Sequence, residues 1–400
     1  MAISEATDSP STNAVTCELT TSSPTAQKFQ QCSVGLLDTN DDPEIRFDDQ
    51  GRSHYYHEYH ETARKCVVPA KQRPQRLKAL VERIKRAGKG KPYDCIVGVS
   101  GGVDSTYVAL IAKQLGLRPL AVHLDNGWNS ELAVQNITNI VNRLEIDLHT
   151  KVLDWDSFRR LQDAYLRAGV IDVEVPTDHA IAGSVYRIAM KHNVKFILSG
   201  NNRRTECTIP PHWNFHKLDH VNLLAINRRF GTGKLKAYPL VHFLLKQKMR
   251  RWFALESIPL LDIVEYDKSE AKRRIAEELS WRDYGGKHYE SIFTRFYQGY
   301  ILPEKFGVDK RKAHLSDLIF AGQMTKNEAI EELSQPIYDA GQFRTDYEFF
   351  LKKMGYSESD FDRIMKTPQR RHSDFPVETA VLANWRGKTN QSSRQGNGTV

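Results

Sequence analysis

The sequence predicts an α/β fold in which a doubly wound parallel sheet is followed by a C-terminal helical region. Between residues 94 and 199, apolar runs of strand length alternate with segments whose apolar residues recur at helical spacing. This alternation is typical of a parallel sheet covered by helices on both faces. The first apolar run ends in a Ser-Gly-Gly turn that opens a helix. Ligands of such sheets bind beyond the carboxyl ends of the strands, so we expect the functional residues there.

The expected core elements follow from these apolar patterns. We expect strands near residues 94–99, 119–124, 147–152, 195–199 and 260–264. We expect helices between and after them, near residues 104–115, 131–144, 156–168, 178–192 and 269–279. We expect an amphipathic helix before the sheet, at residues 74–86. We expect four short helices in the C-terminal region, at 316–322, at 327–333 and, as a pair, within 346–365.

Composition shifts divide the 400-residue chain into five parts. Residues 1–29 are rich in Ser, Thr and Ala without periodicity, which indicates a disordered arm. An accessory segment (30–70) precedes the core (71–280). A helical substrate or partner region (281–368) then precedes a polar tail (369–400).

Charge and cysteine usage narrow the function classes. The chain carries a formal net charge of +8, with Lys and Arg spread along its length. This charge suits a polyanionic nucleotide, and we do not expect nucleic acid as a partner. The five cysteines form no C-x-x-C pair, which is typical of a reducing compartment. No apolar run is long enough to span a bilayer, so we expect a cytoplasmic protein that binds no membrane.

The turn after the first strand, S-G-G-V-D-S-T, predicts a site for the phosphates of ATP. Backbone N–H groups at the amino end of a helix, together with the helix dipole, suit pyrophosphate. Asp104 would be misplaced beside bare phosphate, so we interpret it as a group for the Mg²⁺ that accompanies a nucleotide. The other expected ATP contacts in this turn are Ser100, Gly101, Gly102, Ser105 and Thr106. The alternative is a capped helix without a ligand, because strand–glycine–helix turns are common.

Polar residues at two other strand ends extend the predicted ATP site. Asp125 and Asn126 follow the second strand and could contact adenine or ribose, although a simple Asp-Asn-Gly turn has the same sequence. Gly200 follows the fourth strand, where a backbone must pass close to an α-phosphate, and Asn201 adds a polar side chain.

Two segments supply candidates for binding a second substrate. Thr177 is expected to cap a helix, which leaves His179 free to face the pocket beside Asp178. The polar, partly basic segment after the fourth strand suits a phosphate-rich ligand, and we expect Arg203 and Glu206 to contact it.

A Gly-Gly segment after the core, D-Y-G-G-K-H-Y-E-S, predicts close approach of the backbone to a ligand, with an ordinary helix-to-helix turn as the alternative. Lys287 and His288 join Asp104 as candidate catalytic residues. The expected substrate contacts here and in the next basic cluster are Tyr284, Gly285, Gly286, Lys287, Glu290 and Arg311.

Two histidine groups have helical spacing. The first group could ligate a metal together with Cys32 or Cys66, but a partly solvated aromatic helix is the preferred interpretation. It consists of His54, His57 and His60. The second group consists of His212, His216 and His220. Neighbouring prolines argue against one long helix there, and we do not expect it to bind a metal.

Eight sequence blocks together resemble the N-acetyl sugar amidotransferases of bacterial surface-polysaccharide biosynthesis. These enzymes are ATP pyrophosphatases of the PP-loop (adenine nucleotide alpha-hydrolase-like) type. The blocks lie within residues 93–338 and include S-G-G-V-D-S-T, A-V-H-L-D-N-G-W, V-P-T-D-H-A-I, I-L-S-G-N-N and D-Y-G-G-K-H-Y-E-S. The last block is seldom found in other PP-loop families, so it is the most specific.

The resemblance implies an activity, its cofactors and its partners. Such enzymes convert the N-acetyl group of a nucleotide-activated sugar into an acetamidino group through an adenylated intermediate, and release AMP and pyrophosphate. The implied cofactors are ATP and Mg²⁺. The implied partners are the nucleotide-sugar and a separate glutaminase subunit that supplies ammonia. Family members also carry paired cysteines like a zinc knuckle. Here only Cys32 remains, and Gly35, Ser53 and Tyr56 stand at the other positions, which puts bound zinc in doubt.

Other interpretations stay open. The basic charge allows a PP-loop enzyme that modifies tRNA, but thiolation usually needs paired reactive cysteines, and Cys207 stands alone. Another amide- or amidine-forming ligase of secondary metabolism is also possible. An asparagine-synthetase-like enzyme would carry a cysteine nucleophile after Met1. A non-catalytic nucleotide-binding subunit would not need Asp104 and the G-G-K-H block, although their presence does not settle the matter.

Overall fold

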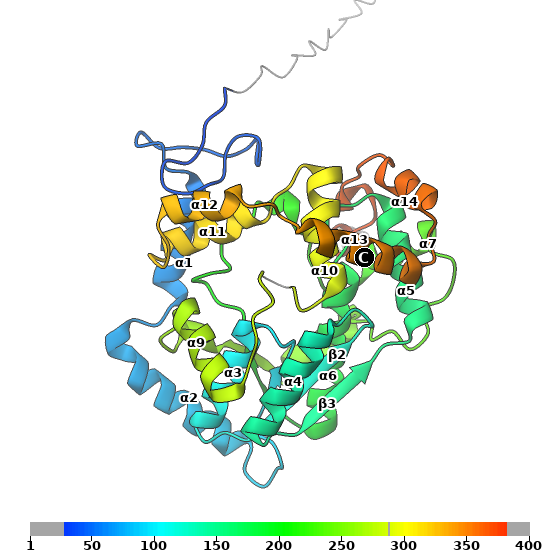
Figure 1. Ribbon diagram of the computed structural model, residues 1–400. Helices are drawn as coiled ribbons and strands as arrows, with labels where there is room; N and C mark the ends of the chain where they lie inside the picture. The colour runs from blue at the N-terminus through cyan, green and yellow to red at the C-terminus, as the bar shows by residue number, and fades with distance from the viewer. Residues whose placement is uncertain (1–27, 287–288, 382–400) are drawn as a thin grey trace, which may run out of the picture.

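The computed structural model describes residues 28–286 and 289–381. A five-stranded parallel sheet with strand order β3-β2-β1-β4-β5 lies at the centre of the fold, with helices packed around it (Figure 1). The strands are β1 (Cys95–Gly98), β2 (Pro119–Asp125), β3 (Leu148–Val152), β4 (Phe196–Ser199) and β5 (Glu256–Pro259). This topology confirms the predicted doubly wound α/β class.

Alternate side chains of β1 enter two hydrophobic clusters on opposite faces of the sheet. Cys95 and Val97 are buried on one face against helices α2, α3, α4 and α9, whereas Ile96 is buried on the other face against α6. This division follows from the two-residue period of a strand. The covering helices are α2 (Arg73–Ala87), α3 (Val103–Gln114), α4 (Glu131–Leu144), α6 (Val175–His192) and α9 (Lys268–Leu279). Each coincides with an expected helix to within three residues.

The last strand differs from the sequence prediction. The apolar run at 260–264 is not a strand: Leu260–Asp262 forms a 3-10 helix, and β5 precedes it. β5 is an edge strand with Glu256 and Ser257 in its pairing register with β4. An edge strand tolerates such polar residues, so the apolar pattern of β5 is weak in the sequence. Leu260 and Leu261 are buried in the 3-10 helix, in the same hydrophobic cluster as Val97.

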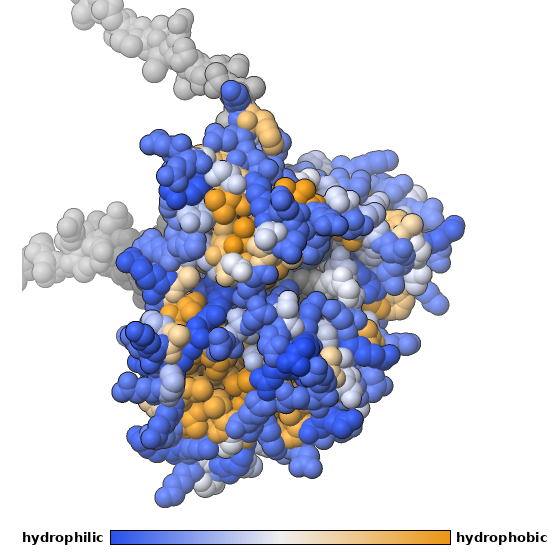
Figure 2. Space-filling model, turned by 60° about the vertical axis from the view of Figure 1, so that its left-hand side comes forward, coloured by the Kyte–Doolittle hydropathy of each residue, from blue (hydrophilic) through white to orange (hydrophobic). Residues whose placement is uncertain are grey.

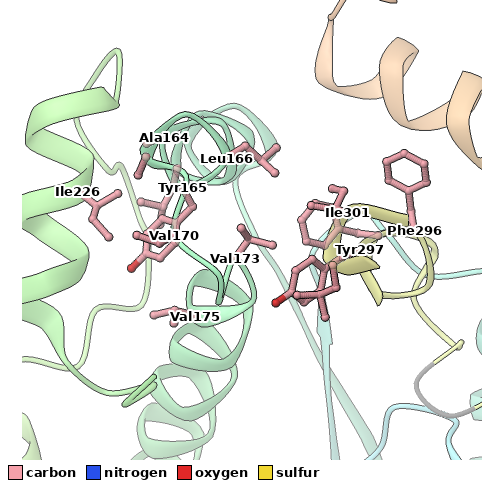
Figure 3. Close-up of a cluster of buried hydrophobic side chains, with 14 of the residues drawn as sticks. Ala164, Tyr165, Leu166, Val170, Val173, Val175, Ile226, Phe296, Tyr297 and Ile301 are labelled. Atoms are coloured by element: carbon pink, nitrogen blue, oxygen red, sulfur yellow. The ribbon is translucent and has the colours of Figure 1, made fainter. Parts of the chain in front are cut away.

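A second large cluster joins the C-terminal helices to the core. Side chains from α5 (Trp155–Ala168), α7 (His220–Phe230) and the segment after α10 (Ile292–Phe296) are buried together. Figure 3 shows Tyr165, Ile226 and Tyr297 converging from these elements. The Tyr297 hydroxyl donates to the Ile171 carbonyl oxygen at 2.6 Å. The helical region and the α5–α7 layer therefore share one hydrophobic core.

Most of the remaining helices lie in the upper part of Figure 1. Helix α1 (His54–Cys66) lies against α11 (Arg311–Phe320), which packs on α12 (Lys326–Ser334). Helix α13 (Ala340–Met354) packs on α10, and α14 (Glu358–Met365) follows it. A π-helical segment, Tyr297–Phe306, continues α10, and the short α8 (Phe243–Gln247) precedes β5. Within the described residues, no helix is both long enough and apolar enough to cross a membrane.

The polar tail begins later in the structure than the sequence predicts. Residues 369–381 belong to the fold: His372 stacks on Phe215 with ring centroids 4.1 Å apart, and Phe375 is buried. Glu378 pairs with Lys246 of α8. Two aromatic anchors are enough to hold a segment whose overall composition is polar. The expected arm (1–27) and the rest of the tail (382–400) lie outside the described residues.

Candidate active site

The turn after β1 forms a tight backbone loop at the amino end of α3. Gly101 has φ of +88°, a conformation that side chains with a Cβ rarely adopt. Gly102 is the N-cap of α3, and no side chain caps the helix there. The Ser100 hydroxyl accepts a hydrogen bond from the Gly102 N–H at 3.2 Å. A loop of this shape, with a helix amino end behind it, suits a bound phosphate group.

Two of the three hydroxyl groups of the turn, those of Ser105 and Thr106, donate to the Gly102 carbonyl oxygen, at 3.1 and 2.7 Å. The Ser105 and Ser100 hydroxyl oxygens lie 3.2 Å apart at the rim of the loop, and both residues are partly buried. Thr106 is fully buried, and its hydroxyl donates to the Gly102 carbonyl oxygen at 2.7 Å. The expectation that Thr106 donates to phosphate is therefore wrong, because its one hydroxyl proton is used inside the first helical turn.

Asp104 lies in the first turn of α3, and its carboxylate accepts a hydrogen bond from the Tyr266 hydroxyl. Burial and the Asp104 carboxylate raise the pKa of Tyr266, so this hydroxyl keeps its proton and remains a donor. Glu206 also raises that pKa, which places its carboxylate close by. Mg²⁺ in nucleotide sites takes one or two carboxylates together with phosphate oxygens. One carboxylate beside a phosphate-binding turn fits that ion.

Gly200 allows the loop after β4 to pass against the amino end of α3. A Cβ at this position would lie 3.1 Å from the Asp104 carbonyl carbon and 3.1 Å from the Ser105 nitrogen. The next residue, Asn201, is exposed, and its N–H donates to the Ser199 hydroxyl at 3.1 Å. Both residues therefore border the predicted ATP site.

The closing segment, residues 281–286 together with 289 and 290, is distant in sequence and lies against the phosphate-binding turn. The Trp281 indole N–H and the Tyr284 hydroxyl both donate to the Gly101 carbonyl oxygen, at 2.6 and 2.8 Å. The Asn136 amide of α4 donates to the Tyr284 oxygen at 2.9 Å. A Cβ at Gly102 would lie 3.2 Å from a Glu290 carboxylate oxygen. Tyr284 and Glu290 thus lie at the turn, and their contact with a substrate stays a prediction.

The Gly-Gly pair lies in this closing segment. Gly285 has φ of +79° and open space where a side chain would be, whereas a Cβ at Gly286 would meet the Tyr289 ring at 2.4 Å. The two candidate catalytic residues that follow, Lys287 and His288, lie outside the described residues. Their roles stay predictions.

The polar residues after β2 make a local turn. One Asp125 carboxylate oxygen accepts from the Gly127 N–H at 2.8 Å, and the Asn126 side-chain oxygen accepts from the Trp128 N–H at 3.1 Å. This is the simple turn that the sequence left as the alternative. Asn126 is 8% exposed, which leaves little of its side chain for a ligand. Asp125 is partly buried at the carboxyl edge of the sheet, so a contact with ATP stays a prediction.

Two expected substrate contacts serve the fold. His179 is fully buried, its Nδ1 lies 2.9 Å from the Lys217 carbonyl oxygen, and its Nε2 accepts from the Val241 N–H at 2.8 Å. Burial lowers the pKa of His179 to about 4, so it is neutral and does not face a pocket. The Arg311 guanidinium pairs with Asp309 at 2.8 Å and donates to the Gln335 carbonyl oxygen after α12.

The cause of the His179 error is the start of α6. Thr177 does not cap this helix: α6 begins at Val175, and Thr177 lies in its first turn with a buried hydroxyl that has no hydrogen-bond partner. His179 lies in the second turn of this helix and is buried against Lys217 and Val241, whereas Asp178 is partly exposed. Arg203 is exposed, and its N–H donates to an Asp262 carboxylate oxygen at 2.7 Å.

Sequence reasoning missed a cluster of charged residues at the amino end of α6. The Thr294 hydroxyl contacts both Glu174 carboxylate oxygens at 3.1 Å. Lys217 bonds to Asp172 at 2.6 Å and to Asp178 at 3.1 Å. Burial, and secondarily Asp178, raise the pKa of Glu174 to about 7. No motif marks Glu174, although it directly precedes the V-P-T-D-H-A-I block.

The zinc knuckle implied for the N-terminal segment does not fit this chain. The Cys32 sulfur accepts hydrogen bonds from the Gly35 and Ser53 N–H groups, both at 3.2 Å. A Cβ at Gly35 would lie 2.8 Å from the Phe320 ring, and Tyr56 packs edge-on against that ring. The described residues hold no group of three metal-ligating side chains. The residues at the knuckle positions are therefore held by hydrogen bonds to Cys32 and by an aromatic contact with Phe320.

Two family models match separate parts of the chain. "Queuosine biosynthesis protein QueC" matches residues 94–191, which contain the phosphate-binding turn. "LPS biosynthesis protein WbpG-like, C-terminal domain" matches residues 290–389. The match over residues 94–191 supports the predicted resemblance to PP-loop ATP pyrophosphatases. The WbpG-like C-terminal domain confirms the predicted resemblance to the amidotransferases of surface-polysaccharide biosynthesis.

The PP-loop core is also similar to proteins of known identity. GMP synthase [glutamine-hydrolyzing] of Pyrobaculum aerophilum is 31% identical over 245 residues, which are 59% of this chain and 41% of that protein. The chain thus spans about two fifths of the length of this relative.

Two solved structures are more distant. NMN synthetase of Francisella tularensis is 14% identical, with a TM-score of 0.29 over 72% of this chain and 98% of that one. NH3-dependent NAD synthetase of Campylobacter jejuni is 11% identical, with a TM-score of 0.29 over 78% and 98%.

Proposed function

We propose that this PP-loop protein is an ATP-dependent amidotransferase that converts the N-acetyl group of a nucleotide-activated sugar into an acetamidino group. The observation that supports the proposal best is the contact of Trp281 and Tyr284 with the Gly101 carbonyl oxygen. This contact joins the phosphate-binding turn to the D-Y-G-G-K-H-Y-E-S segment, which leads directly into the WbpG-like domain. One site therefore contains the ATP-binding motif and the most specific motif of the amidotransferase resemblance.

The proposed reaction overcomes the low reactivity of an amide. The amide oxygen attacks the α-phosphorus of ATP, so that an O–P bond forms and pyrophosphate leaves. Ammonia then adds to the activated carbon, and the C–O bond breaks with its electron pair on AMP. The products are the amidine, AMP and pyrophosphate. The turn around Gly101 would hold the β- and γ-phosphates, and the closing segment would hold the amide close to the α-phosphate.

A divalent ion would contribute charge neutralisation. Asp104, oriented by Tyr266, would hold Mg²⁺ together with phosphate oxygens of ATP. When bound, this ion would offset the negative charge that develops on the departing pyrophosphate. The Tyr266 hydroxyl donates to the Asp104 carboxylate and so orients it.

An external source of ammonia is part of the proposal. None of the four cysteines in the described residues is an activated nucleophile: Cys95 is buried with a raised pKa, and burial raises the pKa of Cys207 to about 11. Cys32 accepts two backbone hydrogen bonds, and Cys66 is exposed at the end of α1. A separate glutaminase subunit is therefore the proposed donor.

The test is a reaction of the purified protein with ATP, MgCl₂, ammonium chloride and a panel of UDP-linked N-acetyl sugars. Mass spectrometry is expected to show sugar-dependent AMP and a product about 1 Da lighter than the sugar substrate, because an oxygen is replaced by an NH group. Formation of ADP, or AMP formation that depends on added tRNA and not on any sugar, would contradict the proposal. The second outcome would favour the tRNA-modifying alternative.

A further inference from the structure

Glu174 occupies a position that its structural role does not explain. It is the N-cap residue of α6, yet its side chain makes no capping hydrogen bond with the helix. Its carboxylate oxygens instead face α10, where the Thr294 hydroxyl lies 3.1 Å from each of them. Helix α6 leads into β4, so its amino end lies toward the carboxyl edge of the parallel sheet, as the phosphate-binding turn does.

The contact with Thr294 places Glu174 near the ATP site. Thr294 follows Glu290 by four residues, and the Glu290 carboxylate lies beside Gly102. Four residues span at most about 14 Å even when fully extended. Part of this segment is the α10 helix, which is shorter per residue. The segment that reaches Gly102 through Glu290 therefore also contacts Glu174 through Thr294.

Some of the charged side chains around Glu174 form ion pairs with one another, and others do not. Lys217 bonds to both oxygens of Asp172 at 2.7 and 2.6 Å and also reaches Asp178 at 3.1 Å. Within residues 28–286 and 289–381, neither Glu174 nor Lys310 forms an ion pair. Lys310 lies 5.4 Å from the Tyr297 ring centroid and is partly buried.

We infer that Glu174 is the proton acceptor for the amine that adds to the activated amide carbon. This inference rests on the proposed function. Nitrogen of ammonia donates its lone pair to the carbon, a C–N bond forms, and the adduct carries an ammonium group. One proton passes from that group to a Glu174 carboxylate oxygen. The C–O bond to AMP then breaks with its electron pair on AMP, and Glu174 later releases the proton to water.

The surroundings of Glu174 suit this role. Burial and Asp178 raise its pKa to about 7, whereas Lys217 and Lys310 act in the opposite direction and Asp172 adds to the increase. A general base works best when its pKa lies near the working pH. The Thr294 hydroxyl donates to the carboxylate and orients it.

The experiment separates activation of the amide from addition of the amine. Wild type, Glu174→Gln and Glu174→Asp are assayed with ATP, ammonium chloride and the UDP-linked sugar that gives most product. Activation is followed as sugar-dependent exchange of labelled pyrophosphate into ATP without ammonia, and amine addition as amidine formation. We expect Glu174→Gln to keep exchange within about threefold and to lose amidine formation by a factor of about 10² or more, the scale of general base catalysis. Glu174→Asp is expected to recover part of the loss.

The pH dependence gives a readout that a structural role would not move. At a fixed concentration of free NH₃, amidine formation by wild type should rise with pH through about 7 as Glu174 ionises, whereas amidine formation by Glu174→Gln should not. Thr294→Val removes a donor to the charged form and should shift this rise to higher pH. The matched control is Glu304→Gln, a change at an exposed carboxylate of the same region, which should match wild type.

The outcomes are distinguishable. If wild type makes no sugar-dependent AMP, the proposed function fails and the inference fails with it. If wild type makes amidine and Glu174→Gln does so at the same rate with the same pH profile, the inference alone is overturned. If Glu174→Gln does not fold, the inference is overturned when the rise of amidine formation with pH in Thr294→Val lies at the same pH as in wild type.

Discussion

The Tyr284 hydroxyl donates a hydrogen bond to the Gly101 carbonyl oxygen across 2.8 Å, although 183 residues separate the two in the chain. Trp281 donates to the same oxygen at 2.6 Å. A carbonyl oxygen has two lone pairs, so these donors satisfy it completely and hold the peptide that links Gly101 to Gly102 in one orientation. The shape of the phosphate-binding turn, which precedes α3, therefore depends on the segment before the WbpG-like domain. Four of the predictions below test this site and its neighbours.

Tyr284→Phe should weaken ATP binding without unfolding the protein. The change removes one hydrogen bond to Gly101, and a neutral hydrogen bond contributes about 1 kcal/mol, so the Kd for ATP should rise roughly fivefold to tenfold. Isothermal titration calorimetry measures it. Tyr93→Phe is the matched control, because its hydroxyl bonds to Asp147 on the surface. Equal effects of the two substitutions would show that the contact with Gly101 has no special role.

Gly101→Ala should destabilise the protein more than Gly90→Ala. Both glycines have positive φ, +88° and +75°, so both substitutions carry a similar backbone strain of roughly 1 kcal/mol. At Gly101 the added Cβ would also lie 2.6 Å from the Tyr284 oxygen and 3.1 Å from the Ala133 carbonyl oxygen, whereas Gly90 has nothing within 4 Å. Urea denaturation compares the two free energies of unfolding. A loss at Gly90 as large as that at Gly101 would contradict the expected close packing of the turn.

Asp104→Asn should abolish ATP-dependent release of AMP and leave the fold intact. The substitution keeps the size of the side chain and an acceptor for the Tyr266 hydroxyl, but removes the negative charge that would hold Mg²⁺. Product analysis by ion-exchange chromatography and a circular dichroism spectrum together test this prediction. Turnover equal to that of wild type would refute the role of Asp104.

Glu174→Gln should make the protein relatively more stable as the pH increases. The folded protein raises the pKa of Glu174 from 4.5 to about 7. A raised carboxyl pKa favours the folded state below the unfolded pKa, and this contribution is lost as the pH rises through the folded pKa. Glutamine does not titrate. The stability of the variant minus that of wild type should therefore increase between pH 4.5 and 7, toward an upper limit of about 3 kcal/mol.

Urea denaturation at pH 5, 6, 7 and 8 gives this difference directly. Glu304→Gln serves as the control, because its carboxylate is exposed and its difference from wild type should stay small at every pH. A stability difference for Glu174→Gln that does not change with pH would show that Glu174 titrates normally.

Removal of metal ions should leave the N-terminal segment folded. The Cys32 sulfur accepts two N–H groups at 3.2 Å, and Phe320 fills the space at Gly35. Dialysis against EDTA should therefore not lower the melting temperature, and elemental analysis should find no stoichiometric zinc. Cys32→Ala should cost roughly 1 to 3 kcal/mol, because two buried N–H groups lose their acceptor. A fall in melting temperature on dialysis that added zinc reverses would contradict this assignment.

Local patterns were sufficient to predict the sheet and the turn. The apolar runs at β1, β2, β3 and β4 predicted strands at these places, and the S-G-G-V-D-S-T turn predicted the amino end of α3, whose role as an anion site stays a prediction. Strand β5 was missed because an edge strand can carry polar residues such as Glu256 and Ser257. His179 was assigned to the pocket because the helix start was placed at Asp178 and not at Val175. The face of α6 that carries His179 packs against Lys217 and Val241, which are distant in sequence.

The sequence by itself determined the parallel α/β core, the turn after the first strand and a second motif around Tyr284, since each depends on residues adjacent in the chain. Only the tertiary structure decided that this block closes on Gly101, that His179 and Arg311 serve the fold, and that Glu174 and Lys310 lie near one another. The physical reason is that burial and the electrostatic environment of a side chain depend on groups brought from distant parts of the chain. A pattern read along the sequence does not contain those distances.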